Sequence, residues 1–229
     1  SSPDRKNSTM NIASLRQSGI TLPNRDYYLK DDDRSKSIRE ELQKYMVNLF
    51  KLVGYDEKIA EDKAATQMKF EIELAAISFS NLELRDPNLN YNKMSADDLA
   101  ALSPGFNWKL YFREIGVENP VEINVGQKKY FEEFGKTFDK TDLEVLKNYI
   151  EWRLINGASP YLSSDFVNAN FEFNGKFMSG ALEQRPRWKQ VLDVVNGSLG
   201  EALGELYVEK HFPPAAKQRI KDLVANLKI

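Results

Sequence analysis

The chain has 229 residues, 41% of them hydrophobic and 29% charged, and its formal net charge is -2. This charge gives no strong field for nucleic acid or an anionic membrane, and no run approaches the roughly 20 apolar residues of a membrane span. The absence of Cys and the presence of one His exclude disulfides, thiolate nucleophiles, cysteine zinc sites and sites built from several histidines.

Residues 1–30 show turn and loop chemistry without clear periodicity, which predicts an extended arm. The chain starts at Ser1 rather than Met and ends inside a helical pattern. We therefore expect a piece of a longer polypeptide. From Ser37 onward, apolar residues recur every three or four positions, which predicts a helical body over residues 37–229.

The first helical pattern runs from Ile38 to Val53, and Gly54 follows as a stop. Residues 57–80 carry apolar stripes on two sides, which indicates a helix that is buried on both of these faces. Ser95 fits an N-cap, and Thr141 with Glu144 has capping-box spacing. Further helices are expected within residues 104–116, 141–157, 166–173, 186–206 and 213–227.

Residues 121–125 alternate apolar and polar side chains and form the one convincing strand pattern. No partner strand is evident nearby in the sequence, which leaves open that the partner lies outside this chain. The predicted fold is therefore all-α: an irregular multi-helix domain with long loops and at most one short β element, as a single domain over residues 1–229.

No catalytic constellation emerges from the residues alone. His211 has no second His and is interpreted as a residue that closes a helix. Adjacent acidic residues on a helix point in different directions, so they predict solvated surface charge: Glu71 and Glu73, Asp97 and Asp98, Glu132 and Glu133.

Three other patterns have structural interpretations. Asp31-Asp32-Asp33 lacks the ligand spacing of a calcium loop and is interpreted as an exposed turn. Gly200 and Gly204 lie inside a helical stripe, which predicts close helix packing. The basic cluster of residues 185–189 predicts a helix start with salt bridges rather than a nucleic-acid contact.

Several strings are more particular than helix propensity requires. They are Leu22-Pro-Asn-Arg-Asp-Tyr-Tyr-Leu29, Leu84-Arg-Asp-Pro-Asn-Leu-Asn-Tyr-Asn-Lys-Met94, Pro186-Arg-Trp188 and Leu199-Gly-Glu-Ala-Leu-Gly-Glu-Leu-Tyr-Val208. In this order they resemble the non-catalytic N-terminal region of the neprilysin and endothelin-converting-enzyme family of zinc metallopeptidases. The resemblance covers essentially the whole chain.

The resemblance implies that this chain is the helical cap lobe of a zinc endopeptidase, enclosing the active-site chamber and admitting only oligopeptides. It implies zinc in the parent enzyme but no cofactor, metal ligand or catalytic residue in this fragment. The implied partners are the catalytic lobe of the same polypeptide and oligopeptide substrates, without nucleic acid. The implied location is extracytoplasmic, in the periplasm or cell envelope, and the lack of Cys favours a bacterial member.

The matched strings also supply residues for which we expect structural or inter-lobe roles. Neighbouring Arg and Asp cannot pair well within one short loop, so each is expected to reach a separate partner. The candidates are Arg25, Asp26, Tyr27, Tyr28, Arg85, Asp86, Tyr91, Asn92 and Trp188.

Two alternatives remain open. The first is a stand-alone helical peptide-binding or scaffolding module without protease activity. The second is a carboxylate hydrolase, which needs two acids facing each other in one pocket. The parent sequence beyond Ile229 separates the first alternative from a protease lobe, because a protease continues with a His-Glu-x-x-His motif.

Overall fold

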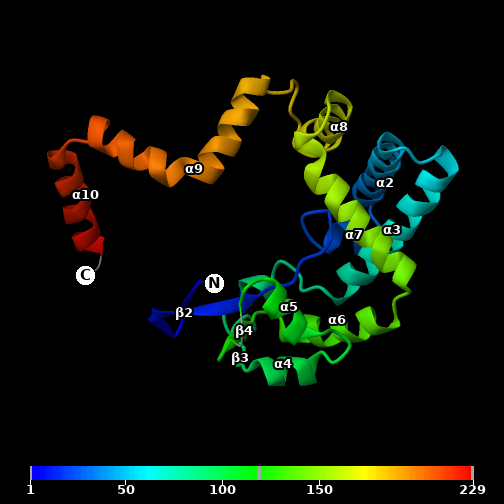
Figure 1. Cartoon of the computed structure of the whole chain (residues 1–229), viewed down its shortest axis with the longest axis horizontal. Helices are drawn as coiled ribbons and strands as arrows, with labels where there is room; N and C mark the ends of the chain where they lie inside the picture. Colours follow the sequence, from blue (N-terminus) through cyan, green and yellow to red (C-terminus); the bar gives the residue numbers. More distant parts are fainter. Residues whose placement is uncertain (1, 118–119, 228–229) are drawn as a thin grey trace. The chain divides into compact units, whose positions relative to one another are not determined.

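A computed structural model describes residues 2–117 and 120–227. The chain divides into two compact units, with the boundary in the sequence between Met178 and Ser179, and each unit is described by itself. The first unit contains β1 (Ser2–Asp4), β2 (Asn7–Leu15), α1 (Asp26–Leu29), α2 (Asp33–Val53), α3 (Glu57–Ile77), η1 (Glu83–Arg85), β3 (Lys93–Met94), α4 (Ala96–Leu102), α5 (Trp108–Glu114), β4 (Ile123–Val125), α6 (Lys128–Lys140), α7 (Leu143–Ala158), η2 (Ser159–Tyr161), α8 (Ser164–Asn170) and the π-helix η3 (Phe171–Phe177) (Figure 1). The second unit contains α9 (Arg187–His211) and α10 (Pro214–Leu227).

Helix α2 begins earlier than the apolar pattern suggests. The side chain of Asp32 accepts a hydrogen bond from the Ser35 N–H at 2.9 Å and so caps the helix. Asp31, Asp32 and Asp33 are exposed as predicted, but the prediction of a turn is wrong for Asp33, which is the first residue of the helix that Asp32 caps. Gly54 ends α2 as expected, with a positive φ of 114°.

The sequence predicts caps for two later helices, and the structure has one of them and not the other. Ser95 and Asp98 form the capping box of α4, which confirms the N-cap prediction for Ser95. The predicted capping box of Thr141 and Glu144 is wrong. Asp142 caps α7 instead, accepting from the Glu144 N–H at 2.7 Å, because its carboxylate lies one residue closer to the free amides of the first turn.

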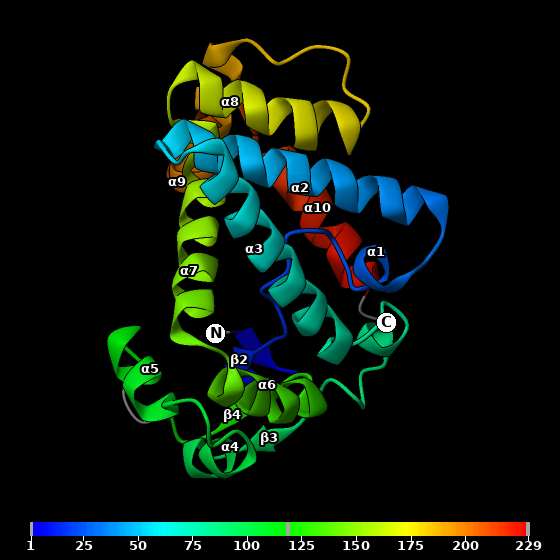
Figure 2. The same cartoon turned by 90° about the vertical axis from the view of Figure 1, so that its right-hand side faces the viewer.

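The first hydrophobic core lies among α2, α3, α7 and α8. Figures 1 and 2 show α2, α3 and α7 side by side. Trp152 of α7 is fully buried between Phe50 and Tyr45 of α2. Helix α3 buries Ala60 and Ala64 toward this core, and Phe70 meets Tyr149 edge-on. This arrangement confirms the prediction of a helix buried on two sides.

The second hydrophobic core joins α4, α5 and α6 to β4. Its fully buried members are Leu99, Ile123 and Val125, with Trp108 beside them. Helices α4 and α6 approach closely where Gly135 packs on Ser103: a Cβ at Gly135 would lie 2.9 Å from the Ser103 Cα. Glycine allows this approach because it has no Cβ.

A small four-stranded sheet in the order β1-β2-β4-β3 supports the second core. β2 pairs in parallel with β4 through Ala13–Ile123 and Leu15–Val125, and β3 pairs antiparallel with β4. The predicted strand is thus confirmed over residues 123–125, but its partners lie inside this chain. Sequence inspection missed β2 because it lies about 110 residues earlier, in the segment expected to be an extended arm.

The second unit consists of helices without a core of their own. No described residue of α9 or α10 is buried. Arg185 pairs with Asp193, as the basic cluster predicts for a helix start. Among the described residues of this unit, no other element packs within 4 Å of a Cβ built at Gly200 or Gly204, so α9 and α10 do not make the predicted close packing. Close packing against backbone occurs instead in the first unit, where a Cβ built at Gly105 would overlap the Gly135 carbonyl oxygen.

The helical fold class is confirmed, with the β structure confined to one small sheet. The prediction that residues 1–229 form a single domain stays a prediction, because compactness alone does not tell whether the two units fold independently.

Candidate functional site: a segment anchored between two cores

The irregular stretch of residues 16–24, here called the anchored segment, connects the two cores of the first unit. It leaves β2 at Leu15, which packs on the second core, and buries Leu22 in the first. Gly19 turns the chain with a positive φ of 108°, and a Cβ there would lie 2.8 Å from the Tyr149 Oη. Only glycine fits this position without strain.

A buried carboxylate holds the middle of the anchored segment. Glu71 of α3 is fully buried, and its Oε1 accepts from the Thr21 Oγ1 at 2.6 Å and from the Gln67 Nε2 at 2.8 Å. Its Oε2 accepts from the Thr21 N–H at 2.9 Å and from the Tyr28 hydroxyl. The Trp152 Nε1 donates to the Thr21 Oγ1 at 2.9 Å. A buried carboxylate requires such partners because its desolvation is otherwise costly.

Burial raises the pKa of Tyr28 above its ordinary value, and the neighbouring Glu71 charge raises it further. The Tyr28 hydroxyl also accepts from the Leu22 N–H at 2.9 Å, so it stays protonated as a donor to Glu71.

The interpretation of Glu71 as solvated surface charge is wrong, whereas Glu73 is exposed. The helical spacing could have indicated that Glu71 is buried. Glu71 lies four residues after Gln67 and four before Ala75, and these residues share one buried stripe of α3.

Side chains from three elements fix the start of the anchored segment. The Gln127 Oε1 accepts from the Gln17 N–H at 2.7 Å, and the Phe79 N–H donates to the Gln17 Oε1 at 2.7 Å. The hydroxyls of Tyr130 and Tyr149 donate to the carbonyls of Ser18 and Gly19 at 2.8 and 3.0 Å. These bonds come from α6 and α7 as well as from the end of α3, so the segment depends on tertiary packing.

Two cavities flank the anchored segment and share Arg16, Ser18 and Gly19. The first, here called the aromatic pocket, has a volume of about 510 Å³. Its walls come from α3, α5, α6 and α7 and include Phe70, Phe106, Trp108, Tyr111, Tyr130, Phe131, Phe134, Phe138, Tyr149 and Ile150. A concave, mostly aromatic lining with few polar groups is typical of a site that takes an apolar side chain.

The second cavity, here called the arginine cleft, has a volume of about 540 Å³ and is lined by Arg5, Arg16 and Arg153 together with backbone of the anchored segment. No Asp or Glu belongs to its lining. Within residues 2–117 and 120–227, none of these arginine side chains forms a hydrogen bond or ion pair. Unpaired guanidinium groups around a cleft favour an anionic ligand.

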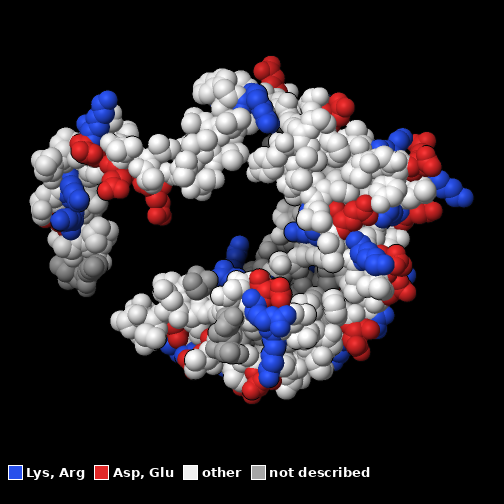
Figure 3. Space-filling view, viewed as in Figure 1, with Lys and Arg blue, Asp and Glu red and all other residues white. Residues whose placement is uncertain are grey.

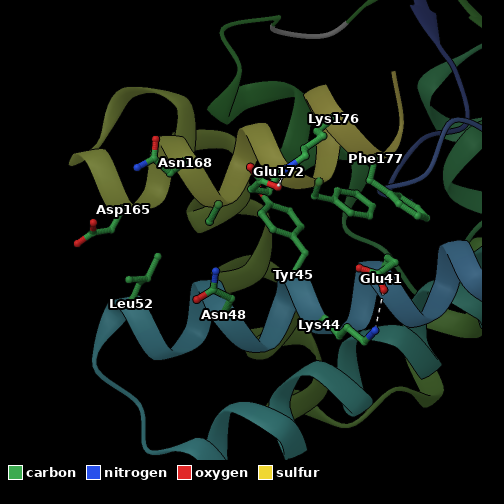
Figure 4. Close-up of a pocket in the computed structure, with 12 residues that line it drawn as sticks. Glu41, Lys44, Tyr45, Asn48, Leu52, Asp165, Asn168, Glu172, Lys176 and Phe177 are labelled. Carbon is green, nitrogen blue, oxygen red and sulfur yellow. Dashed lines mark hydrogen bonds and ion pairs between the residues drawn. The ribbon is translucent and has the colours of Figure 1, made fainter. Parts of the chain in front are cut away.

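A third cavity lies between α2 and the stretch formed by α8 and η3, with a volume of about 620 Å³ (Figure 4). Four of its five charged side chains form pairs: Lys44 contacts Glu41 at 2.6 Å, and Lys176 contacts Glu172 at 2.9 Å, while Asp165 has no such partner among the described residues. Tyr45, on its floor, donates to the Asn156 Oδ1 at 3.0 Å. This paired groove has fewer free groups for a ligand than the arginine cleft.

The structure gives separate partners to the Arg25-Asp26 pair. The Arg25 Nη1 donates to the Ser78 carbonyl at 2.6 Å, and Asp26 pairs with Lys30 at 2.9 Å. The Tyr27 carbonyl accepts from Arg39 at 2.7 Å. With Tyr28, these residues gather at the end of the anchored segment.

The second matched string lies elsewhere, beside the sheet. The Asp86 Oδ1 accepts from the Asn88 N–H at 2.8 Å, while the Arg85 side chain has no partner in the described part of the chain. The Tyr91 hydroxyl donates to Asp4 at 2.7 Å, and the Asn92 Nδ2 donates to the Val125 carbonyl at 3.0 Å. Trp188 belongs to the second unit and is 64% exposed. The candidates therefore do not form one site.

The described residues show no group of three His, Asp or Glu that could hold a metal ion, and no helix among them is long and apolar enough to cross a membrane. His211 closes α9 as expected. Acidic and basic side chains lie next to one another on the face shown in Figure 3. The residues present do not fit a zinc site, so no catalytic step is assigned to them.

The comparisons place this fold in a family. The profile described as "Peptidase family M13", for its N-terminal region, matches residues 1–229. Human endothelin-converting enzyme 1 is 33% identical over 99% of this chain, which spans 30% of that enzyme. Neprilysin-2 of Drosophila melanogaster is 29% identical over 98% of this chain.

Solved structures point to the same family. The open state of the Mycobacterium tuberculosis zinc metalloprotease Zmp1 matches 93% of this chain with a TM-score of 0.85 and 32% identity, and the chain covers 33% of that protein. PepO of Lactobacillus rhamnosis shares the fold, with a TM-score of 0.75 at 15% identity. The fold is thus that of the mostly helical N-terminal region of an M13 peptidase. The chain belongs to peptidase family M13 and spans about 30% of the curated relatives it matches.

Proposed function

We propose that this chain is the non-catalytic N-terminal lobe of a zinc-dependent endopeptidase, in which it encloses the active-site chamber and restricts substrates to oligopeptides. The observation that carries the proposal is the match of nearly the whole chain to one third of a zinc metalloprotease. The zinc and its ligands then belong to the other two thirds of the parent.

The second unit carries an exposed apolar surface that a partner lobe would cover. Helix α9 carries apolar side chains that are at least 41% exposed, including Leu199, Leu203 and Leu206. A contiguous apolar stripe of this kind is stable in water only when it is covered. We propose that the catalytic lobe of the same polypeptide covers it and that Gly200 and Gly204 allow a close approach there.

The first experiment tests whether this chain cleaves peptides or binds zinc by itself. The isolated chain is expected to cleave no oligopeptide and to bind no stoichiometric zinc in a calorimetric titration, and the parent reading frame is expected to encode His-Glu-x-x-His beyond residue 229. Turnover, or tight equimolar zinc binding by this chain, would contradict the proposal. A parent without the motif favours the alternative, a helical peptide-binding or scaffolding module.

The second experiment tests the inter-lobe surface in the full-length parent. Leu199→Asp with Leu203→Asp puts two carboxylates into the covered stripe, and we expect peptidase activity to fall at least about tenfold because burying unpaired charge costs several kcal/mol. Leu182→Asp is the control, since Leu182 is 92% exposed and lies outside α9. Equal activity of the two variants would show that the stripe is not an inter-lobe contact.

Size restriction and location belong to the same proposal. The parent is expected to cleave short unfolded peptides and to leave the same sequence intact inside a folded protein. The location implied by the family resemblance is extracytoplasmic, and fractionation of the producing cells checks it. Lack of Cys throughout the chain favours a bacterial parent.

A further inference from the structure

We propose that the anchored segment is a peptide-binding site outside the catalytic chemistry, which takes an aromatic side chain in the aromatic pocket and a nearby carboxylate in the arginine cleft. The inference goes beyond the proposed function, because binding of this kind needs only residues of this chain and no zinc.

The first argument is the position of the two cavities. They lie on either side of the same short backbone stretch and share Arg16, Ser18 and Gly19. A ligand that spans the stretch therefore meets an aromatic lining on one side and guanidinium groups on the other. An extended peptide with an aromatic and an acidic group a few residues apart has this distribution of chemistry.

The second argument is charge complementarity. Arg16 and Arg153 are exposed at the cleft, and the described residues supply no ion-pair partner to either. The buried carboxylate that holds the anchored segment, Glu71, is already satisfied by Thr21, Tyr28 and Gln67. A ligand carboxylate is thus the group that would complete the cleft, and bidentate guanidinium contacts suit it.

The third argument is the backbone of the anchored segment. The carbonyls of Ser18 and Gly19 are held by Tyr130 and Tyr149, whereas the N–H groups of Ser18, Gly19 and Ile20 have no acceptor among the described residues. A fixed backbone with free N–H groups can donate hydrogen bonds to the carbonyl groups of a peptide, and rigid anchoring lowers the entropic cost of binding.

The test measures fluorescence anisotropy of labelled peptides with the 229-residue chain. One set carries Phe and Glu separated by one to three Gly or Ser residues, with an amidated C-terminus. A second set carries Phe and a free C-terminal carboxylate without Glu. Binding of the first set, the second or both identifies the source of the carboxylate. Replacing Phe by Ser, or removing every carboxylate, is expected to weaken binding about tenfold or more.

Protein variants locate the site. Arg153→Glu is expected to weaken binding of carboxylate peptides about tenfold, while Arg34→Glu, the same charge change on α2 outside both cavities, leaves it unchanged. Ile150→Asn at the mouth of the aromatic pocket is expected to weaken binding of Phe peptides about fivefold. Leu154→Asn is its control, because Leu154 is 68% exposed on the same helix and lines neither cavity.

Circular dichroism checks that each variant folds, and Arg16→Ala replaces Arg153→Glu if the latter does not. Raising the salt concentration is also expected to weaken binding. The proposal is overturned if no peptide binds, if Glu→Gln peptides with amidated ends bind as well as their parents, or if Arg153→Glu and Arg34→Glu behave alike. None of these results bears on peptidase activity of the parent, so the two proposals fail separately.

Discussion

Glu71 shows how one side chain positions a segment 50 residues away. It accepts hydrogen bonds from Thr21, Tyr28 and Gln67 while fully buried. Replacing it removes an acceptor and leaves several donors unsatisfied, which is more costly than losing one exposed contact.

We therefore expect Glu71→Leu to lower the free energy of unfolding by about 2–4 kcal/mol. Chemical denaturation followed by circular dichroism measures this change. Glu73→Leu is the matched control on the exposed side of the same helix, with an expected change within about 0.5 kcal/mol. Similar losses for both variants would mean that Glu71 does not anchor Thr21 and Tyr28.

Asp4 supplies a pH-dependent contribution to stability. The Lys6 N–H, the Tyr91 hydroxyl and Lys93 hold the pKa of this carboxyl below its ordinary value, against the opposing effect of burial. The folded state therefore binds fewer protons than the unfolded state in the acid range. The contribution is present above the unfolded pKa of about 3.9 and is lost as the pH falls through the folded pKa.

The Asp4→Asn variant is expected to have a lower free energy of unfolding than the unsubstituted chain at pH 6. This difference is expected to shrink as the pH falls toward about 2.5. Denaturation curves across this range measure it. Tyr91→Phe removes one of the bonds to Asp4 and is expected to show a smaller version of the same trend. A difference that does not depend on pH would exclude a role for the Asp4 charge.

Among the helix ends, the C-terminal end of α2 depends on backbone conformation rather than on side-chain contacts. Gly54 ends α2 with a φ of 114°, and no described atom lies within 4 Å of a Cβ built there. The cost of Gly54→Ala is therefore conformational, about 1 kcal/mol of stability. Gly157→Ala, in open space inside α7, is expected to stabilise the chain by about 0.5–1 kcal/mol. Thermal unfolding of the two variants checks that the signs are opposite.

At the scale of the whole molecule, the two units differ in what holds them together. Both hydrophobic cores consist of residues before Met178, while α9 and α10 bury none of their described residues. We therefore expect the first unit to pack without the second. The exposed stripe of α9 is expected to promote self-association of the chain when no other lobe covers it.

Removing residues 179–229 is accordingly expected to leave the Tm of the first unit within about 2 °C of the full chain, since a change of 1 kcal/mol moves Tm by about 2–4 °C. Differential scanning calorimetry measures this, and sedimentation shows whether the shorter chain associates less. Loss of cooperative unfolding in the shortened chain would mean that the second unit is required for the first to fold.

Linear patterns in the sequence were enough to predict most of the helices, the Ser95 cap, the Gly54 stop and the family. Helical periodicity, the Ser95 cap and the Gly54 stop depend on residues within a few positions of one another, so a linear pattern reveals them. The strings around Leu22, Leu84 and Leu199 were enough to indicate an M13-like N-terminal region, which the comparisons confirm.

The folded chain was needed to find the pairing of β2 with β4, the hydrogen-bond partners of Glu71 and the two cavities beside the anchored segment. Each brings together groups separated by 50 to 130 positions, such as Thr21 with Glu71 and Gly19 with Tyr149. No local pattern encodes such contacts, because the free energy that forms them comes from burial in a shared core rather than from neighbouring residues.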